Sequence, residues 1–146
     1  MKYLGALLAL LLTASAAAAS EEPSSPNFTC KLAHAATMYD SLKQLPPLLA
    51  SALREKIGPM ADRGEFFNAT DVIIKPGPGR RFIRAGHVRD TWFVWYEQGG
   101  IAYFHAIVMF GSDGRGGLEV IREYQGSWND NLCAETDRLL DKPRAH

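Results

Sequence analysis

The chain has 146 residues, and its 16 lysines and arginines balance 16 aspartates and glutamates. This length predicts one compact domain rather than several. The balanced charge carries no overall signature of nucleic-acid or anionic-membrane binding, so we expect no nucleic-acid partner and look instead for local patches.

The N-terminal residues have the three-part pattern of a secretory signal peptide. Lys2 precedes an apolar run over 4–12, and small residues follow, with Ala17 and Ala19 in the A-x-A spacing of a cleavage site. A membrane anchor is the alternative, but a bilayer span needs about 20 consecutive apolar residues and this run is shorter. We therefore expect a signal peptide over 1–19, cleaved near Ala19, a mature protein without a membrane span, and a periplasmic or extracellular location.

The mature part begins with a polar, proline-interrupted stretch over 20–26 that is typical of a flexible leader, and a single domain is expected over 27–142. It contains two cysteines, Cys30 and Cys133. In an oxidising compartment such an isolated pair predicts one disulfide between the beginning and the end of the domain. Two unpaired buried thiols are the alternative. No metal site is expected, because neither cysteine has a second Cys or His at ligand spacing.

Two helices are predicted in the first part of the domain. From Asn27 onward, apolar residues recur at steps of three and four, which predicts a helix that ends at Pro46. Pro47 suits the first position of a second helix, and Gly58 followed by Pro59 would end it.

After Gly64 the pattern changes from helical to strand-like. Short runs of β-branched and aromatic residues alternate with glycine-rich breaks, which predicts an antiparallel β-meander of four to five strands. Ser127 and Asp130 then form a capping box that predicts a C-terminal helix. The fold class is therefore α+β, with N-terminal helices, the meander and a closing helix. The predicted strands cover 66–75, 80–85, 91–97, 101–110 and 118–124.

The densest apolar segment is 91–110, TWFVWYEQGGIAYFHAIVMF, and Gly99-Gly100 inside it predicts a two-residue hairpin turn. That turn would pair Gln98 with Ile101 and alternate the side chains between two faces. A slip of one residue would exchange the faces of a strand. One face would be uniformly apolar and would seat the helices, with Phe93, Trp95, Ala102, Phe104, Ala106, Val108 and Phe110. The other would be amphipathic, with Trp92, Val94, Tyr96, Tyr103, His105, Ile107 and Met109.

Three coverings of this amphipathic face are open. The terminal helix or a loop of the protein itself would bury it, since buried Tyr and Trp usually find a local partner. A curved sheet would instead shelter a small apolar ligand. A second copy or another protein would dock on it, because exposed aromatic patches mark interfaces. The candidate ligand or partner surface comprises Trp92, Tyr96, Tyr103 and His105.

Catalysis is the alternative function. His105 with Tyr103 and Tyr96 would supply the acid–base groups of a small pocket enzyme. No nucleophile–base pair accompanies them, so the sequence favours a non-catalytic role. The stretches KPGPGRR and GSDGRGG indicate turns rather than phosphate or calcium loops, because the first contains prolines without N–H groups and the second lacks further carboxylates. We expect neither a cofactor nor a metal.

One local basic cluster surrounds the strand predicted over 80–85. Alternation places Arg80 and Arg84 on the same face and Arg81 on the other. An anion, a lipid headgroup or an acidic protein partner would contact Arg80 and Arg84. The alternative is that these charges protect an edge strand from aggregation.

Two sequons, at Asn27 and Asn68, leave N-glycosylation open and matter only in a eukaryotic secretory pathway. Together the features predict an exported, disulfide-bonded α+β domain. Its expected role is to bind a protein, a second copy of itself or a small apolar ligand through the aromatic hairpin.

Overall fold

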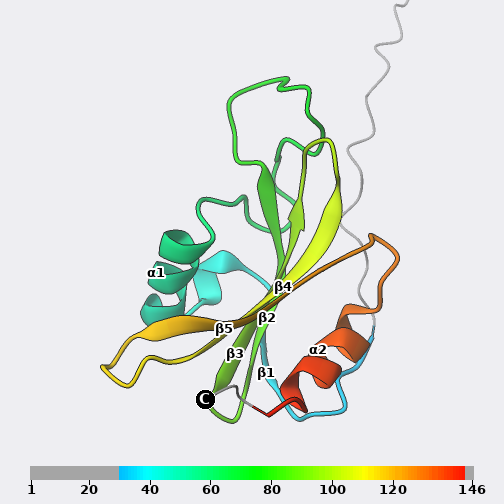
Figure 1. Ribbon diagram of the computed structural model, residues 1–146. Coiled ribbons are helices and arrows are strands. Elements are labelled where there is room, and N and C mark those ends of the chain that lie inside the picture. Colours follow the sequence, from blue (N-terminus) through cyan, green and yellow to red (C-terminus); the bar gives the residue numbers. More distant parts are fainter. Residues whose placement is uncertain (1–29, 144–146) are drawn as a thin grey trace, which may run out of the picture.

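The computed structural model describes residues 30–143. The predicted signal peptide, the leader and the sequon at Asn27 lie outside these residues. The elements, in chain order, are β1 (Thr37–Tyr39), the short 3-10 helix η1 (Leu42–Gln44), α1 (Pro47–Lys56), β2 (Arg80–Val88), β3 (Thr91–Gln98), β4 (Phe104–Ser112), β5 (Leu118–Gly126) and α2 (Leu132–Leu140) (Figure 1).

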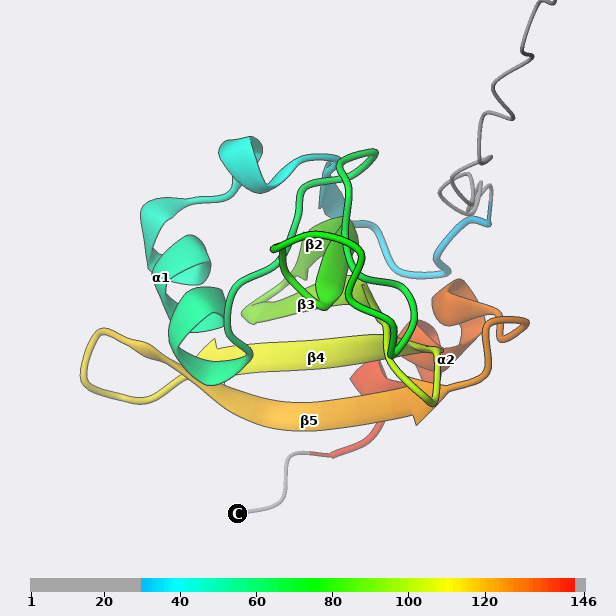
Figure 2. The ribbon, with the colours of Figure 1, turned by 90° about the horizontal axis from the view of Figure 1, so that it is seen from above.

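The five strands form one antiparallel meander in the order β1-β2-β3-β4-β5, so each strand pairs with its neighbour in the chain. The sheet is twisted, with α1 against one face and α2 against the other (Figures 1 and 2). The predicted α+β class is confirmed, with a short N-terminal helix, a five-stranded antiparallel sheet and a C-terminal helix.

Helix α1 forms where the sequence predicts it. Pro47 occupies its first turn, and Gly58, with φ of 101°, follows its end in the left-handed region that glycine adopts readily. Leu49 and Leu53 lie one turn apart on the face that packs against the sheet. The fully buried residues beneath them include Phe82, Ala85, Val94, Val108 and Phe110.

Helix α2 covers the opposite face, where Phe93, Ile107 and Met109 are buried. The indole nitrogen of the buried Trp95 donates to the hydroxyl of Thr136, 2.8 Å away, which fixes the helix against the sheet. Within residues 30–143, neither helix is long and apolar enough to cross a membrane.

The capping box predicted from Ser127 is wrong by one turn. Asn131 caps α2 by accepting a hydrogen bond from the N–H of Ala134 at 3.1 Å. The carboxylate of Asp130 instead accepts bonds from the Ser127 N–H and the Tyr124 hydroxyl, both at 2.7 Å. The polar residues before α2 therefore close a tight turn after β5, and the helix begins after that turn.

The first predicted helix is also wrong. In the described part of that range the chain is irregular up to β1, where an extended backbone pairs with β2. The carboxylate of Asp137 accepts bonds from the backbone N–H groups of Ala33 and His34, at 2.9 and 3.4 Å. Bonds to α2 thus replace the bonds of a local helix, and tertiary contacts decide the conformation.

The predicted disulfide is confirmed. Cys30 and Cys133 are bonded, with their Cα atoms 6.0 Å apart across a sequence separation of 103 residues. The bond ties the irregular segment before β1 to the first turn of α2. A structural disulfide of this kind indicates an oxidising compartment.

Candidate functional site

The register of the aromatic hairpin differs from the predicted one. Gln98 pairs with Phe104, so the loop contains residues 99–103 rather than two glycines. Gly99 is required for another reason, because a Cβ at this position would collide with the backbone oxygen of Asn68 in a neighbouring loop. Gly100 has φ of 122°, again a glycine conformation. The two glycines therefore permit contact between two loops, and the pairing moves by three residues.

Because the shift is an odd number of residues, it exchanges the two faces of β4 relative to β3. Trp92 and Tyr96 lie on the α1 side, whereas His105 lies on the α2 side beside Glu97. Tyr96 is 7% exposed and His105 is 1% exposed. The half-buried Trp92 stacks on His87, with ring centroids 4.0 Å apart. The structure does not bring the four predicted residues together on one amphipathic face.

The α2 side of the sheet instead contains a buried polar network. Arg81 and Glu97 are cross-strand partners and form a bidentate pair, with Nε to Oε1 at 3.0 Å and Nη2 to Oε2 at 3.3 Å. The hydroxyl of Tyr103 donates to the same carboxylate at 2.5 Å, and it lies 3.4 Å from Nε2 of His105. Glu97 was not identified from the sequence. The signal that could have found it is an acidic residue at an inward-facing strand position opposite an arginine.

Electrostatics fixes the protonation states in this network. Burial lowers the pKa of His105, an effect that the nearby Glu97 and Asp130 carboxylates only partly offset. Burial, followed by the hydrogen bond to Glu97, raises the pKa of Tyr103 above its usual range. At neutral pH the imidazole is therefore neutral and Tyr103 is a hydrogen-bond donor. The network anchors the loop over 99–103 to the sheet through Tyr103.

The two arginines predicted to share a face lie on opposite faces. The register shifts between Phe82 and Arg84, and this β-bulge reverses the alternation of the strand. Arg80 is on the α1 side, where its Nε is buried without a hydrogen-bond partner among residues 30–143. Arg84 is on the α2 side and donates from Nε to Asp40 at 2.7 Å. A single anion would therefore not contact both.

An exposed apolar tip is the most prominent surface feature that sequence reasoning did not find. Val72, Ile73 and Ile74 are 65%, 74% and 80% exposed, and Ile101 is 93% exposed. The first three belong to the long loop between α1 and β2, and Ile101 belongs to the β3–β4 loop at the same end of the sheet (Figures 1 and 2). We call these four residues the apolar tip.

Backbone and side-chain hydrogen bonds order the two loops. The N–H of Gly100 donates to the carbonyl of Ala69 at 3.2 Å, which joins the loops directly. The side-chain nitrogen of Asn68 donates to the carbonyls of Lys75 and Gly77, at 3.3 and 3.0 Å. The strand predicted over 66–75 is therefore wrong, because these bonds close a compact loop. They also engage the nitrogen that a glycan at Asn68 would require.

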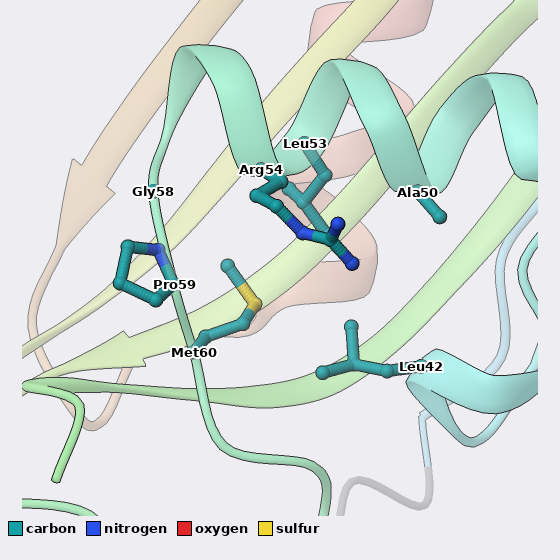
Figure 3. A pocket seen from close by; sticks show the side chains of 7 residues that line it. All are labelled: Leu42, Ala50, Leu53, Arg54, Gly58, Pro59 and Met60. Carbon is teal, nitrogen blue, oxygen red and sulfur yellow. The ribbon is translucent and has the colours of Figure 1, made fainter.

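Figure 3 shows a pocket between η1, α1 and the segment that follows α1. Leu42 and Met60 line it from below the helix, and the side chain of Arg54 extends across it. Its volume is about 190 Å³. Sites for small organic ligands usually enclose about 300–1,000 Å³, so this pocket is too small for most of them.

A larger groove lies on the other side of the sheet, next to the disulfide, and has a volume of about 380 Å³. We call it the disulfide groove; its lining residues are Cys30, Lys31, Leu32, His34, Ala35, Ala36, Met38, Arg84, Trp95 and Cys133. Among residues 30–143, no group of three or more His, Cys, Asp or Glu side chains is arranged to hold a metal ion.

Comparison with known proteins gives no match: no protein-family model fits the chain, and no curated protein or solved structure resembles it significantly. The function must therefore be inferred from the apolar tip, the buried network and the disulfide groove.

Proposed function

We propose that this protein is an exported, non-catalytic binding domain that docks the apolar tip into an apolar groove on a partner protein. The observation that carries the proposal is the exposure of four aliphatic side chains on two loops that hydrogen-bond to each other. Isolated exposed apolar residues are common, but clustered ones mark interaction surfaces.

The order of the tip supports binding rather than chain flexibility. Asn68 closes the longer loop, and the close approach at Gly99 joins it to the hairpin. A surface that is already ordered loses less conformational entropy when it binds. The buried network beneath it, through Tyr103, fixes the hairpin loop in the same way.

The charges around the tip favour a protein partner over an anionic membrane. Asp71 and Lys75 flank the three consecutive aliphatic residues and balance each other. The ammonium group of Lys75 lies 3.8 Å from the centre of the Phe66 ring, so it is already engaged. Membrane-binding segments usually carry several basic residues near the inserted side chains.

Export is part of the proposal. The N-terminal pattern is that of a secretory signal peptide, and the disulfide between Cys30 and Cys133 requires oxidising conditions to persist. The pocket-enzyme alternative gains no specific support, since the rings of Tyr96 and His105 are buried on opposite sides of the sheet.

The test is site-specific photo-crosslinking in the cells that produce the protein. A photoreactive amino acid replaces Ile101, and a matched variant carries it at Arg115, an exposed position in the β4–β5 loop. We expect one partner protein to be captured from position 101 and not from 115. The purified partner should bind the unlabelled domain, and Ile73→Ser should weaken that binding at least about tenfold, since a buried Ile contributes about 1.5–3 kcal/mol.

Thermal unfolding provides the control, because Ile73 is exposed in the free protein and Ile73→Ser should change stability by no more than about 0.5 kcal/mol. If the only crosslinks are to a second copy of the chain, the apolar tip is a homodimer interface and the proposal of a different partner protein is wrong. If the wild type floats with phosphatidylcholine vesicles and Ile73→Ser does not, the apolar tip binds a lipid surface and the proposal of a protein partner is wrong. Equal capture from positions 101 and 115 would contradict it.

A further inference from the structure

The disulfide groove has an apolar floor. Leu32, Met38 and the disulfide itself line it, together with the buried Trp95. These groups belong to the segment before β1, to β1, to β3 and to α2, so the fold and the disulfide bring them together from distant parts of the chain. Its volume of about 380 Å³ lies within the range of small-molecule sites.

The titratable side chains that line the groove are all basic: Lys31, His34 and Arg84. The acidic residues nearby are engaged by other groups. Asp137 accepts the backbone N–H groups of Ala33 and His34, and Asp141 lies 3.0 Å from the His34 ring. The groove therefore offers an apolar floor beneath a basic rim.

Arg84 is the best-positioned cation of this rim. Its Nε donates to Asp40 at 2.7 Å, which orients the guanidinium group. Asp40 also pairs with Arg63 at 3.1 Å, so one carboxylate is shared by two arginines and local positive charge remains. The remaining N–H groups of an arginine form a planar fork that matches a carboxylate or a sulfonate.

We infer that the disulfide groove binds a small organic anion, with an apolar body on the floor of Leu32, Met38 and Trp95 and its charged group on Arg84. This site is separate from the apolar tip and does not depend on the function proposed for it. The complementary charge is the reason for assigning an anionic ligand, because the titratable side chains that line the groove are basic and the carboxylate that pairs with Arg84 is shared with Arg63.

The experiment measures the binding of two fluorescent probes that share an aromatic body. The protein is used in its oxidised form without the predicted signal peptide. Anilinonaphthalene sulfonate carries an anionic group, and phenylnaphthylamine is its uncharged counterpart. We expect saturable binding of the sulfonate and at least tenfold weaker binding of the neutral probe, because the neutral probe has no charged group to pair with the guanidinium of Arg84. In a nitrogen–proton NMR spectrum, the sulfonate should shift the indole N–H signal of Trp95 and leave that of Trp128, which is 64% exposed, unchanged.

Substitutions separate the two parts of the site. Arg84→Gln should weaken sulfonate binding about tenfold and change binding of the neutral probe less than twofold, while Arg84→Lys should retain part of the affinity. Leu32→Asn should weaken both probes. Arg115→Gln, in the exposed β4–β5 loop, is the matched control for charge and should change neither.

Other occupants give different results. If the residues that precede Cys30 occupy the groove, a variant that begins at Cys30 binds the sulfonate and the longer chain does not, which would overturn the proposal. Binding that is lost in Ile73→Ser rather than in Arg84→Gln would place the probe on the apolar tip and would also overturn it. Equal affinity for the two probes would exclude an anion site.

Discussion

The two faces of the sheet are both buried, but different interactions stabilise them. Between α1 and the sheet lies a cluster of aliphatic and aromatic side chains that includes Leu49, Phe82 and Val108. On the α2 face a similar apolar cluster is joined by a disulfide and by the buried Arg81–Glu97 pair. The first face depends mainly on apolar packing, whereas the second also depends on a covalent bond and on a buried ion pair.

This difference bears on function. The long loop of the apolar tip covers Arg81, whose guanidinium lies 4.4 Å from the centre of the Phe67 ring, and the hairpin loop is anchored through Tyr103. The disulfide groove also lies on the α2 side. Both candidate sites are therefore built on the face with polar and covalent bonds, and α1 closes the other side.

Breaking the covalent bond should have the largest effect. Cys30→Ser combined with Cys133→Ser opens a loop of 103 residues, and the chain-entropy model assigns such a loop about 4–5 kcal/mol of unfolding free energy. Urea unfolding of the double variant and the oxidised wild type measures the difference. A loss below about 1 kcal/mol would show that noncovalent packing alone seats the segment before β1.

The next effect tests charge balance with two substitutions that conserve volume, one on each face. Glu97→Gln removes the carboxylate charge that pairs with the buried guanidinium of Arg81 and should cost about 3–5 kcal/mol, the range for breaking a buried pair. The matched control on the α1 face, Leu49→Met, should cost less than about 1.5 kcal/mol. Similar losses from both, measured by urea unfolding, would mean that the two faces do not differ as described.

The smallest effect is a dependence of stability on pH. Because burial lowers the pKa of His105 in the folded protein, the unfolded chain binds this proton more readily. The contribution of His105 is fully present above the unfolded value of about 6.5 and is lost as the pH falls toward the lower folded value. We expect the free energy of unfolding, measured with urea, to fall between pH 7 and 5, and His105→Gln to reduce this fall. An unchanged slope in that variant would assign the pH dependence to other groups.

Local sequence signals identified the helix that begins at Pro47, the four long strands, the closing helix and the disulfide. Each depends on neighbouring residues or, for Cys30 and Cys133, on the absence of any other partner. The first predicted helix failed because Asp137, more than 100 residues away, binds the backbone at Ala33. Apolar periodicity cannot reveal such a competing bond.

The candidate sites were harder to predict. Gly99 and Gly100 suggested a tight turn, but Gly99 serves a contact with Asn68, and the resulting register places His105 on the other face. The bulge after Phe82 separated Arg80 from Arg84 in the same way. Val72–Ile74 resembled a strand because β-branched residues favour one, but the hydrogen bonds of the Asn68 side chain to Lys75 and Gly77 close this segment into a loop.

The position of the two cysteines has a consequence for biosynthesis. Cys30 precedes the whole sheet and Cys133 follows it, and the chain contains no other cysteine. If the chain is exported during its synthesis, as proposed above, an oxidase meets a single thiol until nearly all of the domain has been made. No incorrect intramolecular bridge can form, so this protein needs no disulfide isomerase to correct its pairing, and a mispaired disulfide can only join it to another molecule, such as a second chain.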